Sequence, residues 1–398
     1  MIQVTLCLVC AVHALAAQPS LDQVRELLSK GSRHSAVAML RRIVAADPRN
    51  ADAHIMLGTT LALEGSRSDS IQQLTEAVRL KPDSAEAYRA LGMALARFVE
   101  TKAAREAFEK AIELNPRLAG AHLDLSLILA QSGEWSLARE HLDRAIQIQG
   151  DTPAAARAYY LRAGIHGEQN ELEAALADLE RAVQLRPDFA EAWSDLGAVK
   201  RNLLDDAGAL TALERSVRID PKNGKAQFRL GSEYLHGRKP HLAVEHLRQA
   251  LRLDPDDRAT LYNLQMALRA NGQGEEAKRV EARIAELLRQ RSLASKTAIQ
   301  AAKLNNEGVE MEKTGNLHAA LERYRAALEL DPEHGGFRLN LGLVLCRLGR
   351  WDEGIAEIRE VVRRYPDNAE ATKALYIALE QRLKTPASVE TPAEKPVR

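Results

Sequence analysis

Few side chains in this sequence have the types and spacing that catalysis or metal binding needs. His241 and His246 lie five residues apart, a spacing that does not put two side chains on one face of a helix, and His34, His54 and His122 stand alone. The sequence has no HExxH zinc motif, no GxSxG nucleophile motif, no phosphate-binding glycine loop and no paired CxxC motifs. We therefore expect the histidines to be surface or packing residues, with no metal site, no cofactor and no catalytic activity.

The charged residues also point away from several functional classes. Lys plus Arg and Asp plus Glu both total 55, so the formal net charge is zero. A balanced charge does not favour nucleic acid or a membrane surface as the main partner. Glutamate and arginine recur at helical spacing, and such pairs belong by default to solvated helix faces, where each contributes little stability.

A periodic series of prolines indicates how the helices that would carry a binding site are organised. The intervals between successive members are mostly 34 residues, with one interval of 37 and one of 77. A fixed period in this range is typical of a solenoid, in which small helical units stack on their neighbours. The prolines are Pro48, Pro82, Pro116, Pro153, Pro187, Pro221, Pro255, Pro332 and Pro366.

Other residues fall into register when each repeat is counted from the third residue after its proline. The eighth position is most often glycine, which is costly inside a helix and indicates close approach of a second helix. The fifteenth position is mostly glycine, as a left-handed helix C-cap requires, and apolar residues between follow helical spacing. Each repeat is thus predicted to be two antiparallel helices in an all-α protein. The repeats begin at Ala17, Ala51, Ala85, Ala119, Ala156, Ala190, Gly224, Arg258, Ala301 and Gly335.

Two units carry the pattern most fully. One has Tyr88, Leu91, Gly92, Ala104, Phe108, Ala111 and Pro116, and the other has Trp193, Leu196, Gly197, Ala209, Leu213 and Pro221. In both, the sequence resembles the tetratricopeptide repeat (TPR) family, and the resemblance extends from about Ala17 to Gln381. It implies a right-handed superhelical solenoid of about ten helix-turn-helix units, with the first helix of each unit on the concave wall.

The N-terminal segment differs from the rest of the chain. Residues 1–17 contain no charged side chain, include an apolar run from Val4 to Val12, and end in small residues, which is typical of a secretory signal peptide. A cleaved signal predicts a periplasmic or secreted protein; the alternative is an additional apolar helix in a cytoplasmic protein. After cleavage Cys346 is the only cysteine, so no intrachain disulfide forms, and no membrane span remains.

The chain beyond this segment divides into four parts. The 77-residue interval is two repeats plus nine residues, and the excess contains neither proline nor glycine, which predicts extra helix between two sub-arrays. A last segment with first-helix pattern is expected to cap the array. The predicted parts are TPR repeats 1 to 8 (18–288), a helical joint (289–300), repeats 9 and 10 with the capping helix (301–383), and a disordered proline-rich tail (384–398).

The resemblance also says which positions of each first helix face the groove, and three zones stand out there. In repeats 2 to 4 the groove positions are apolar, which predicts a hydrophobic recognition surface. The alternative is that the groove is narrow and these side chains pack on one another. They are Ile55, Met56, Leu63, Met93, Leu123 and Leu127.

Repeats 5 to 8 place aromatic side chains among basic ones. This composition is typical of binding hot spots, and arginines would suit a guest peptide that carries carboxylates. The principal residues are Arg157, Tyr160, Arg201, Phe228, Arg229 and Tyr262.

Repeats 8 to 10 have asparagine at the sixth position: Asn263, Asn306 and Asn340. An amide both donates and accepts, so it can pair with a peptide backbone whatever its sequence. The arrangement is similar to the asparagine ladder of O-linked N-acetylglucosamine transferases. A chaperone-type carboxylate clamp is not expected, because Glu370 and Ala374 stand where basic residues would be needed.

These observations predict a non-catalytic scaffold that binds extended segments of other proteins in a concave groove. Two alternatives stay open at this point. The repeats could be the substrate-docking or regulatory subunit of a separate modifying enzyme, or they could self-associate into a structural assembly.

Overall fold

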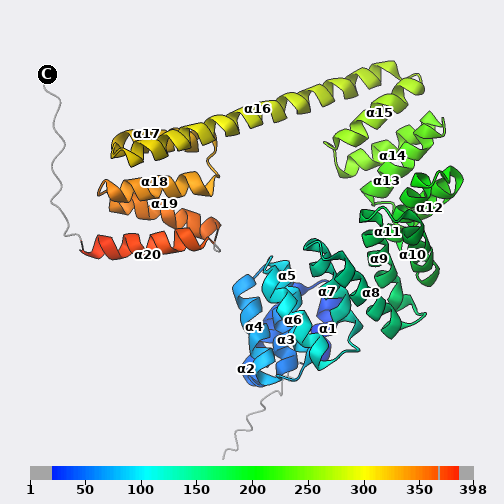
Figure 1. The fold of residues 1–398 in the computed structure, drawn as a ribbon, viewed down its shortest axis with the longest axis horizontal. Coiled ribbons are helices and arrows are strands. Elements are labelled where there is room, and N and C mark those ends of the chain that lie inside the picture. Colours follow the sequence, from blue (N-terminus) through cyan, green and yellow to red (C-terminus); the bar gives the residue numbers. More distant parts are fainter. Residues whose placement is uncertain (1–19, 366–367, 385–398) are drawn as a thin grey trace, which may run out of the picture. The chain divides into compact units, whose positions relative to one another are not determined.

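A computed structural model describes residues 20–365 and 368–384, and every regular element in this part is a helix (Figure 1). The predicted signal peptide and the tail after Lys384 lie outside the described residues. The helices are α1 (Leu21–Ser29), α2 (Arg33–Ala46), α3 (Ala51–Glu64), α4 (Arg67–Leu80), α5 (Ala85–Arg97), α6 (Thr101–Leu114), α7 (Ala119–Gln131), α8 (Trp135–Gln149), the 3-10 turn η1 (Pro153–Ala155), α9 (Ala156–Glu168), α10 (Leu172–Leu185), α11 (Ala190–Asn202), α12 (Asp206–Ile219), α13 (Gly224–His236), α14 (Pro240–Leu253), α15 (Arg258–Ala270), α16 (Gly274–Lys313), α17 (Leu317–Leu330), α18 (Gly335–Arg347), α19 (Trp351–Arg364) and α20 (Ala369–Lys384).

Consecutive helices pack as antiparallel pairs, and the eighth-position glycines allow the close approach. A Cβ atom added at any of six of these glycines would lie between 2.5 and 2.7 Å from an atom of a large side chain at the twenty-fourth position. Real Cβ atoms do not come so near, so only glycine fits without a shift of the partner helix. The pairs are Gly58 with Leu74, Gly92 with Phe108, Gly197 with Leu213, Gly231 with Leu247, Gly308 with Tyr324, and Gly342 with Ile358.

The turn inside each pair requires left-handed backbone at the fifteenth position. The predicted left-handed backbone is confirmed at Asn170, where φ is 58°, and at the six glycines that occupy this position. These are Gly31, Gly65, Gly133, Gly272, Gly315 and Gly349. The structure adds three repeats that lack glycine or asparagine there and still adopt positive φ: Val99 at 64°, Leu204 at 64° and Arg238 at 56°. The hairpin geometry therefore overrides the preference of these residues for negative φ.

The described chain forms two compact units, one ending at Gly272 and the other beginning at Gln273. In the first unit, α1 to α15 are stacked so that each second helix packs on the first helix of the next pair. The 37-residue interval is explained by Gly150, with φ of 60°, followed by η1 before α9 begins. In the second unit, α17, α18, α19 and α20 continue the same stacking from α16.

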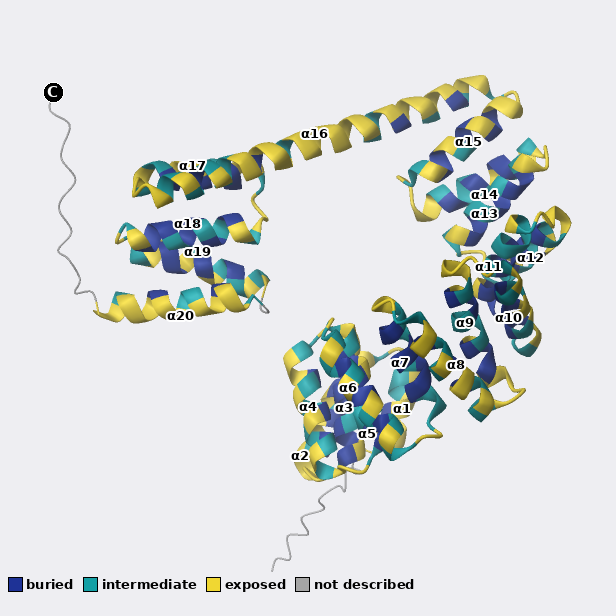
Figure 2. Cartoon of the chain, in the orientation of Figure 1, coloured by how far each residue is buried: buried dark blue, intermediate teal, exposed yellow. Residues whose placement is uncertain are grey.

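The helix α16 is 40 residues long and runs unbroken from Gly274 to Lys313. It joins what the repeat pattern assigns to the second helix of repeat 8 and the first helix of repeat 9, and residues 289–300 lie inside it. Most side chains of that segment are exposed, including Leu293 at 62% and Ile299 at 67% (Figure 2). The boundary between the compact units falls before α16, ahead of the segment predicted as the joint.

Candidate functional site

The first helices of successive pairs lie closer together than the second helices do. In the first unit α3 contacts α5, α5 contacts α7, α11 contacts α13 and α13 contacts α15, whereas successive second helices have no comparable contacts in the described residues. A stack whose first helices are closer must curve toward them. The first helices therefore form the inner wall, and their fifth, sixth and ninth positions are where a bound segment would lie.

A carboxylate that sequence reasoning missed organises the centre of this wall. Asp195, on α11, accepts hydrogen bonds from Tyr160 Oη at 2.9 Å and from Arg229 Nη1 at 2.5 Å, and Lys225 Nζ lies 3.3 Å away. Arg229 also donates to Ser194 Oγ at 2.8 Å. Burial alone would raise the pKa of Asp195, but the charge and hydrogen bond of Arg229 lower the pKa below its usual value. The carboxylate is thus ionised and links repeats 5, 6 and 7.

The predicted Tyr160 and Arg229 are therefore partly structural. Burial, followed by the neighbouring Asp195 charge, raises the pKa of the Tyr160 phenol, so this group stays a hydrogen-bond donor at all ordinary pH values. The Tyr160 ring packs against Phe189 with ring centroids 4.9 Å apart, and Phe189 itself is buried. Tyr160 and Arg229 therefore hold neighbouring repeats together, whether or not they also contact a bound peptide.

Two more ion pairs cross between repeats along the same wall. Arg89 Nε donates to Asp124 Oδ2 at 2.6 Å, and Arg201 Nη1 donates to Glu233 Oε2 at 2.8 Å. Burial raises the pKa of Asp124, and the charge of Arg89 offsets only part of that rise. Arg201 and Arg229 are thus neutralised inside the groove. Among the predicted basic residues, Arg157 is exposed, and its positive charge also acts to lower the pKa of Asp124.

The apolar zone of repeats 2 to 4 is exposed only in part. Leu63 and Met93 are 50% and 45% exposed, respectively, whereas Leu123 is only 8% exposed. Leu123 is thus a core residue and not a recognition residue, because it packs into the hydrophobic cluster that contains Phe108. Ile55, Met56 and Leu127 are half-buried, and the first two pack against core clusters.

The end of the same wall, in repeats 7 and 8, is more open. Tyr262 is 45% exposed and Phe228 is half-buried. Sequence reasoning missed Met266, which is 57% exposed on α15 one turn after Tyr262. The signal was present, since Met266 occupies the ninth position of its repeat and Met93 occupies that position in repeat 3.

The asparagines are engaged to different extents. In the first unit Asn263 donates from Nδ2 to Ser232 Oγ at 2.7 Å. In the second unit Asn340 donates to Asn305 Oδ1 at 2.9 Å, so it pairs with a fifth-position amide of the neighbouring repeat. Asn306 is exposed. Asn263 and Asn340 each keep the side-chain oxygen for an additional donor, but one N–H of each amide is already used.

The second unit has an apolar groove on its own first-helix wall. The groove, of about 360 Å³, lies between α18 and α20, and Leu343, Cys346 and Ile377 form its apolar side, with Arg347 and Lys373 among its polar residues. Burial raises the pKa of the Cys346 thiol, which keeps it protonated and unreactive. None of the residues that line this groove belongs to the three zones predicted from the sequence.

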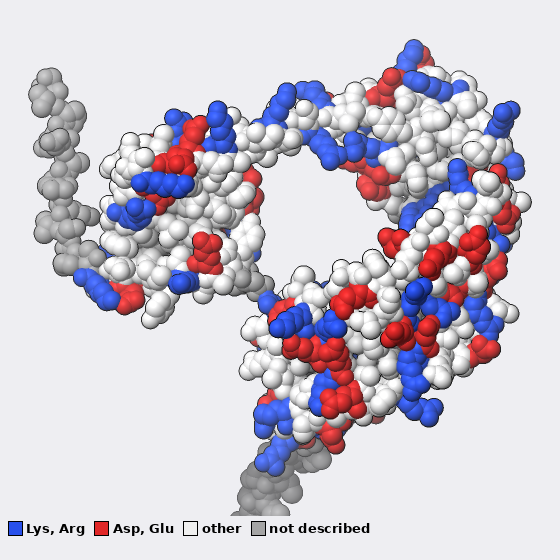
Figure 3. Space-filling model, in the orientation of Figure 1, with Lys and Arg blue, Asp and Glu red and all other residues white. Residues whose placement is uncertain are grey.

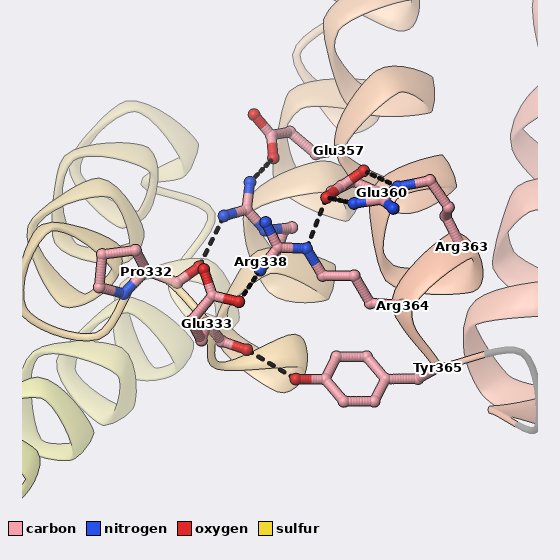
Figure 4. Close-up of polar contacts among 8 residues, drawn as sticks. All are labelled: Pro332, Glu333, Arg338, Glu357, Glu360, Arg363, Arg364 and Tyr365. Carbon is pink, nitrogen blue, oxygen red and sulfur yellow. Dashed lines mark hydrogen bonds and ion pairs between the residues drawn. The ribbon is translucent and has the colours of Figure 1, made fainter.

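The histidines have a structural role that recurs at the fourth position of the repeats. His54 and His122 each place Nε2 3.1 Å from the carbonyl oxygen of the proline six residues earlier. The same proline contact is made by Trp193, Gln227 and, at 2.7 Å, Arg338, whose second partner is Glu357 (Figure 4). A donor at this position therefore ties each first helix to the preceding turn.

The same residues reach a partner nineteen positions later. His122 Nδ1 lies 3.0 Å from His141 Nδ1, and His246 Nδ1 lies 2.8 Å from Gln227 Oε1. Burial lowers the pKa of His122, His141 and His246, so all three favour the neutral form. In the described residues no three His, Cys, Asp or Glu side chains are grouped to hold a metal ion.

The surface is electrostatically mixed. On the face shown in Figure 3, Lys and Arg side chains lie beside Asp and Glu over α1 to α15 and do not form a single patch. Among the described helices, none combines the length and apolar character needed to cross a membrane.

Comparisons with known proteins agree with this architecture. Family models described as tetratricopeptide repeats match residues 27–95, 90–153, 165–202, 224–257 and 307–369. No curated protein sequence matches. Similar solved structures include YrrB, described as a TPR protein with an unusual peptide-binding site (22% identity, 48% of this chain, 96% of that one, TM-score 0.39). Others are PilF of Pseudomonas aeruginosa (18%, 54%, 98%, TM-score 0.49) and a TPR protein of Parabacteroides merdae (14%, 62%, 97%, TM-score 0.47).

Proposed function

Because the chain belongs to the tetratricopeptide repeat family, whose members generally mediate protein–protein interactions, we propose that it is a non-catalytic scaffold that binds extended segments of partner proteins. The binding surface in this proposal is the inner wall of the first unit. Its centre of recognition is the open end formed by α13 and α15.

One observation carries this proposal. The polar side chains of the wall mostly satisfy one another, whereas Tyr262 and Met266 stand 45% and 57% exposed with no core to fill. Met93, farther along the wall, is also 45% exposed. Large apolar side chains that repeatedly face solvent at a fixed repeat position favour a surface that is covered in the complex.

The ion pairs within the wall also indicate which kind of peptide could bind there. Arg201 and Arg229 already have carboxylate partners, so a strongly acidic peptide would have to displace Glu233 and Asp195. The favoured guest is an extended segment with apolar or aromatic side chains, whose backbone pairs with amides such as Asn263. A single carboxylate near Arg157 is compatible with this arrangement.

The proposal can be tested with a displayed library of random twelve-residue peptides selected on the full chain. Selected peptides should bind at least about tenfold more weakly when Tyr262 and Met266 are both replaced by serine, because each loses a buried apolar contact. A matched control is Leu204→Ser, which removes a side chain that is 88% exposed at the turn between α11 and α12.

The control should bind like the unmodified chain. If the Tyr262→Ser, Met266→Ser variant binds selected peptides as tightly as the control does, the inner wall at α15 is not the site. If no peptide is enriched on the unmodified chain over the double variant, peptide binding at this wall is refuted.

A further inference from the structure

The last helix of the second unit exposes an apolar stripe that nothing in the described chain covers. Tyr376 is 70% exposed, Leu379 is 37% exposed and Leu383 is 88% exposed, and Thr372 is exposed one turn earlier. Their spacing of four, three and four residues places all four on one face of α20. The opposite side of the helix is used for packing, since Ala371 and Ala378 are buried against the α19 pair.

This stripe corresponds to a face that is covered in the complete repeats. There the second helix of the pair packs onto the first, and the eighth position is often glycine, as at Gly342. In α20 the eighth position is Tyr376, and no helix follows it in the described residues. A terminal helix that only capped the array would have a polar outer face. Tyr376 instead provides a large aromatic side chain for a contact of a different kind.

The stripe is self-complementary. Thr372 and Leu383 are equally far from the point between Ile377 and Ala378, and so are Tyr376 and Leu379. We propose that α20 pairs with α20 of a second copy of this chain in antiparallel orientation. Two-fold symmetry then places Tyr376 against Leu379 of the partner subunit and repeats the contact on the other side of the axis.

The charges beside the stripe fit the same pairing. Lys373 and Glu380 follow Thr372 and Leu379 by one residue each, so they flank the stripe on one side. In an antiparallel pair such flanks face each other, which brings Lys373 close to Glu380 of the partner subunit. Glu380 is 48% exposed, and among the described residues its partner is Lys384 of the same helix at 2.5 Å, so it can exchange that contact for the intermolecular one.

The contact of one sixteen-residue helix is smaller than a standard interface of about 1,600 Å², so the dimer should be weak. Sedimentation velocity of the full chain from about 1 to 500 µM should show a monomer–dimer equilibrium. Replacing Tyr376 and Leu379 with glutamate should leave a monomer throughout. The matched control, Leu293→Glu, changes an apolar residue that is 62% exposed on α16 and should dimerise normally.

Charge exchange separates this pairing from other forms of association. Lys373→Glu and Glu380→Lys should each weaken dimerisation at least about tenfold, because like charges then face each other. The two substitutions together should restore it, since the opposite charges are exchanged and not removed.

A wild-type chain that stays monomeric over the whole range overturns the proposal. So does an association that the Tyr376→Glu, Leu379→Glu variant retains, or one that the combined charge exchange fails to restore. None of these outcomes bears on peptide binding by the first unit, which is tested separately.

Discussion

Gly231 offers the sharpest test of how the helix pairs are held together. An added Cβ at this position would lie 2.7 Å from Leu247 Cγ, 3.0 Å from its Cδ2 and 3.2 Å from its backbone nitrogen. Leu247 is fully buried, so it cannot turn its side chain into solvent. Rotating that side chain would not relieve the close contact between the added Cβ and the backbone nitrogen of Leu247. Gly231→Ala therefore requires α14 to move away from α13.

The magnitude follows from two opposing effects. Alanine is favoured over glycine within a helix by about 1 kcal/mol. Overpacking of a well-filled core costs about 1–3 kcal/mol. Gly164→Ala on α9 is a matched control, because it lies within a helix and a Cβ there meets nothing within 4 Å. The control should be stabilised by about 1 kcal/mol, and the difference between the two variants should equal the packing cost.

Hydrogen–deuterium exchange of peptides from α13 and α14 is the appropriate assay, since stability in a repeat array is partly local. Exchange there should accelerate in Gly231→Ala, and exchange of α9 should slow in Gly164→Ala. In a Leu247→Ala background the contacts with the leucine side chain are removed and the 3.2 Å contact with the backbone nitrogen remains, so Gly231→Ala should be clearly less destabilising there than in the unmodified chain. Equal stabilisation by both alanine substitutions in the unmodified background would refute the close-approach argument.

Three further predictions concern the turns and the polar contacts. Val99→Asn should stabilise the chain by about 1 kcal/mol in urea unfolding, because asparagine tolerates the left-handed backbone that a β-branched residue resists; a loss of stability would contradict this. Burial lowers the pKa of His122 and His141 below the ordinary value of 6.5, so near and below pH 6.5 the unfolded chain binds more protons than the folded chain. The free energy of unfolding should therefore be highest above pH 6.5 and should fall as the pH is lowered below it. Urea midpoints between about pH 5 and 8 check this, and His122→Gln should flatten the profile, whereas an unchanged profile would count against it. Arg229→Ala should cost about 1–3 kcal/mol by leaving the Asp195 carboxylate without its closest cation, and Arg229→Ala combined with Asp195→Ala should recover part of the loss; a neutral single variant would show that the pair is not structural.

Much of the fold could be read from the sequence because its determinants are local. Helical periodicity, the proline after each second helix and the glycine at the fifteenth position each act within one repeat. Val99, Leu204 and Arg238 show the limit of that reasoning, since they adopt left-handed backbone with no sequence signal of their own. Their repeats adopt the turn because the two helices pack, and the packing energy exceeds the local cost.

The sequence could predict which face of each first helix forms the wall, but not which side chains on that face are exposed and unpaired. The repeat register assigns Tyr262 and Met93 to the inner wall, and both side chains are 45% exposed. It could not show that Leu123 is buried, since burial depends on how deeply the neighbouring helices interdigitate.

The repeating helical hairpin and its spacing follow from the sequence alone, because the periodicity, the turn residues and the close-packing glycines are all encoded within 34 residues. Which charged side chains are paired and which are free depends on how the repeats stack. Asp195 and Arg229 are 34 residues apart and meet because the stack places consecutive first helices side by side. The same stacking brings Tyr160 to Asp195. Contacts between repeats depend on the rotation from one repeat to the next, which arises from the summed packing of many side chains and leaves no mark at any single position.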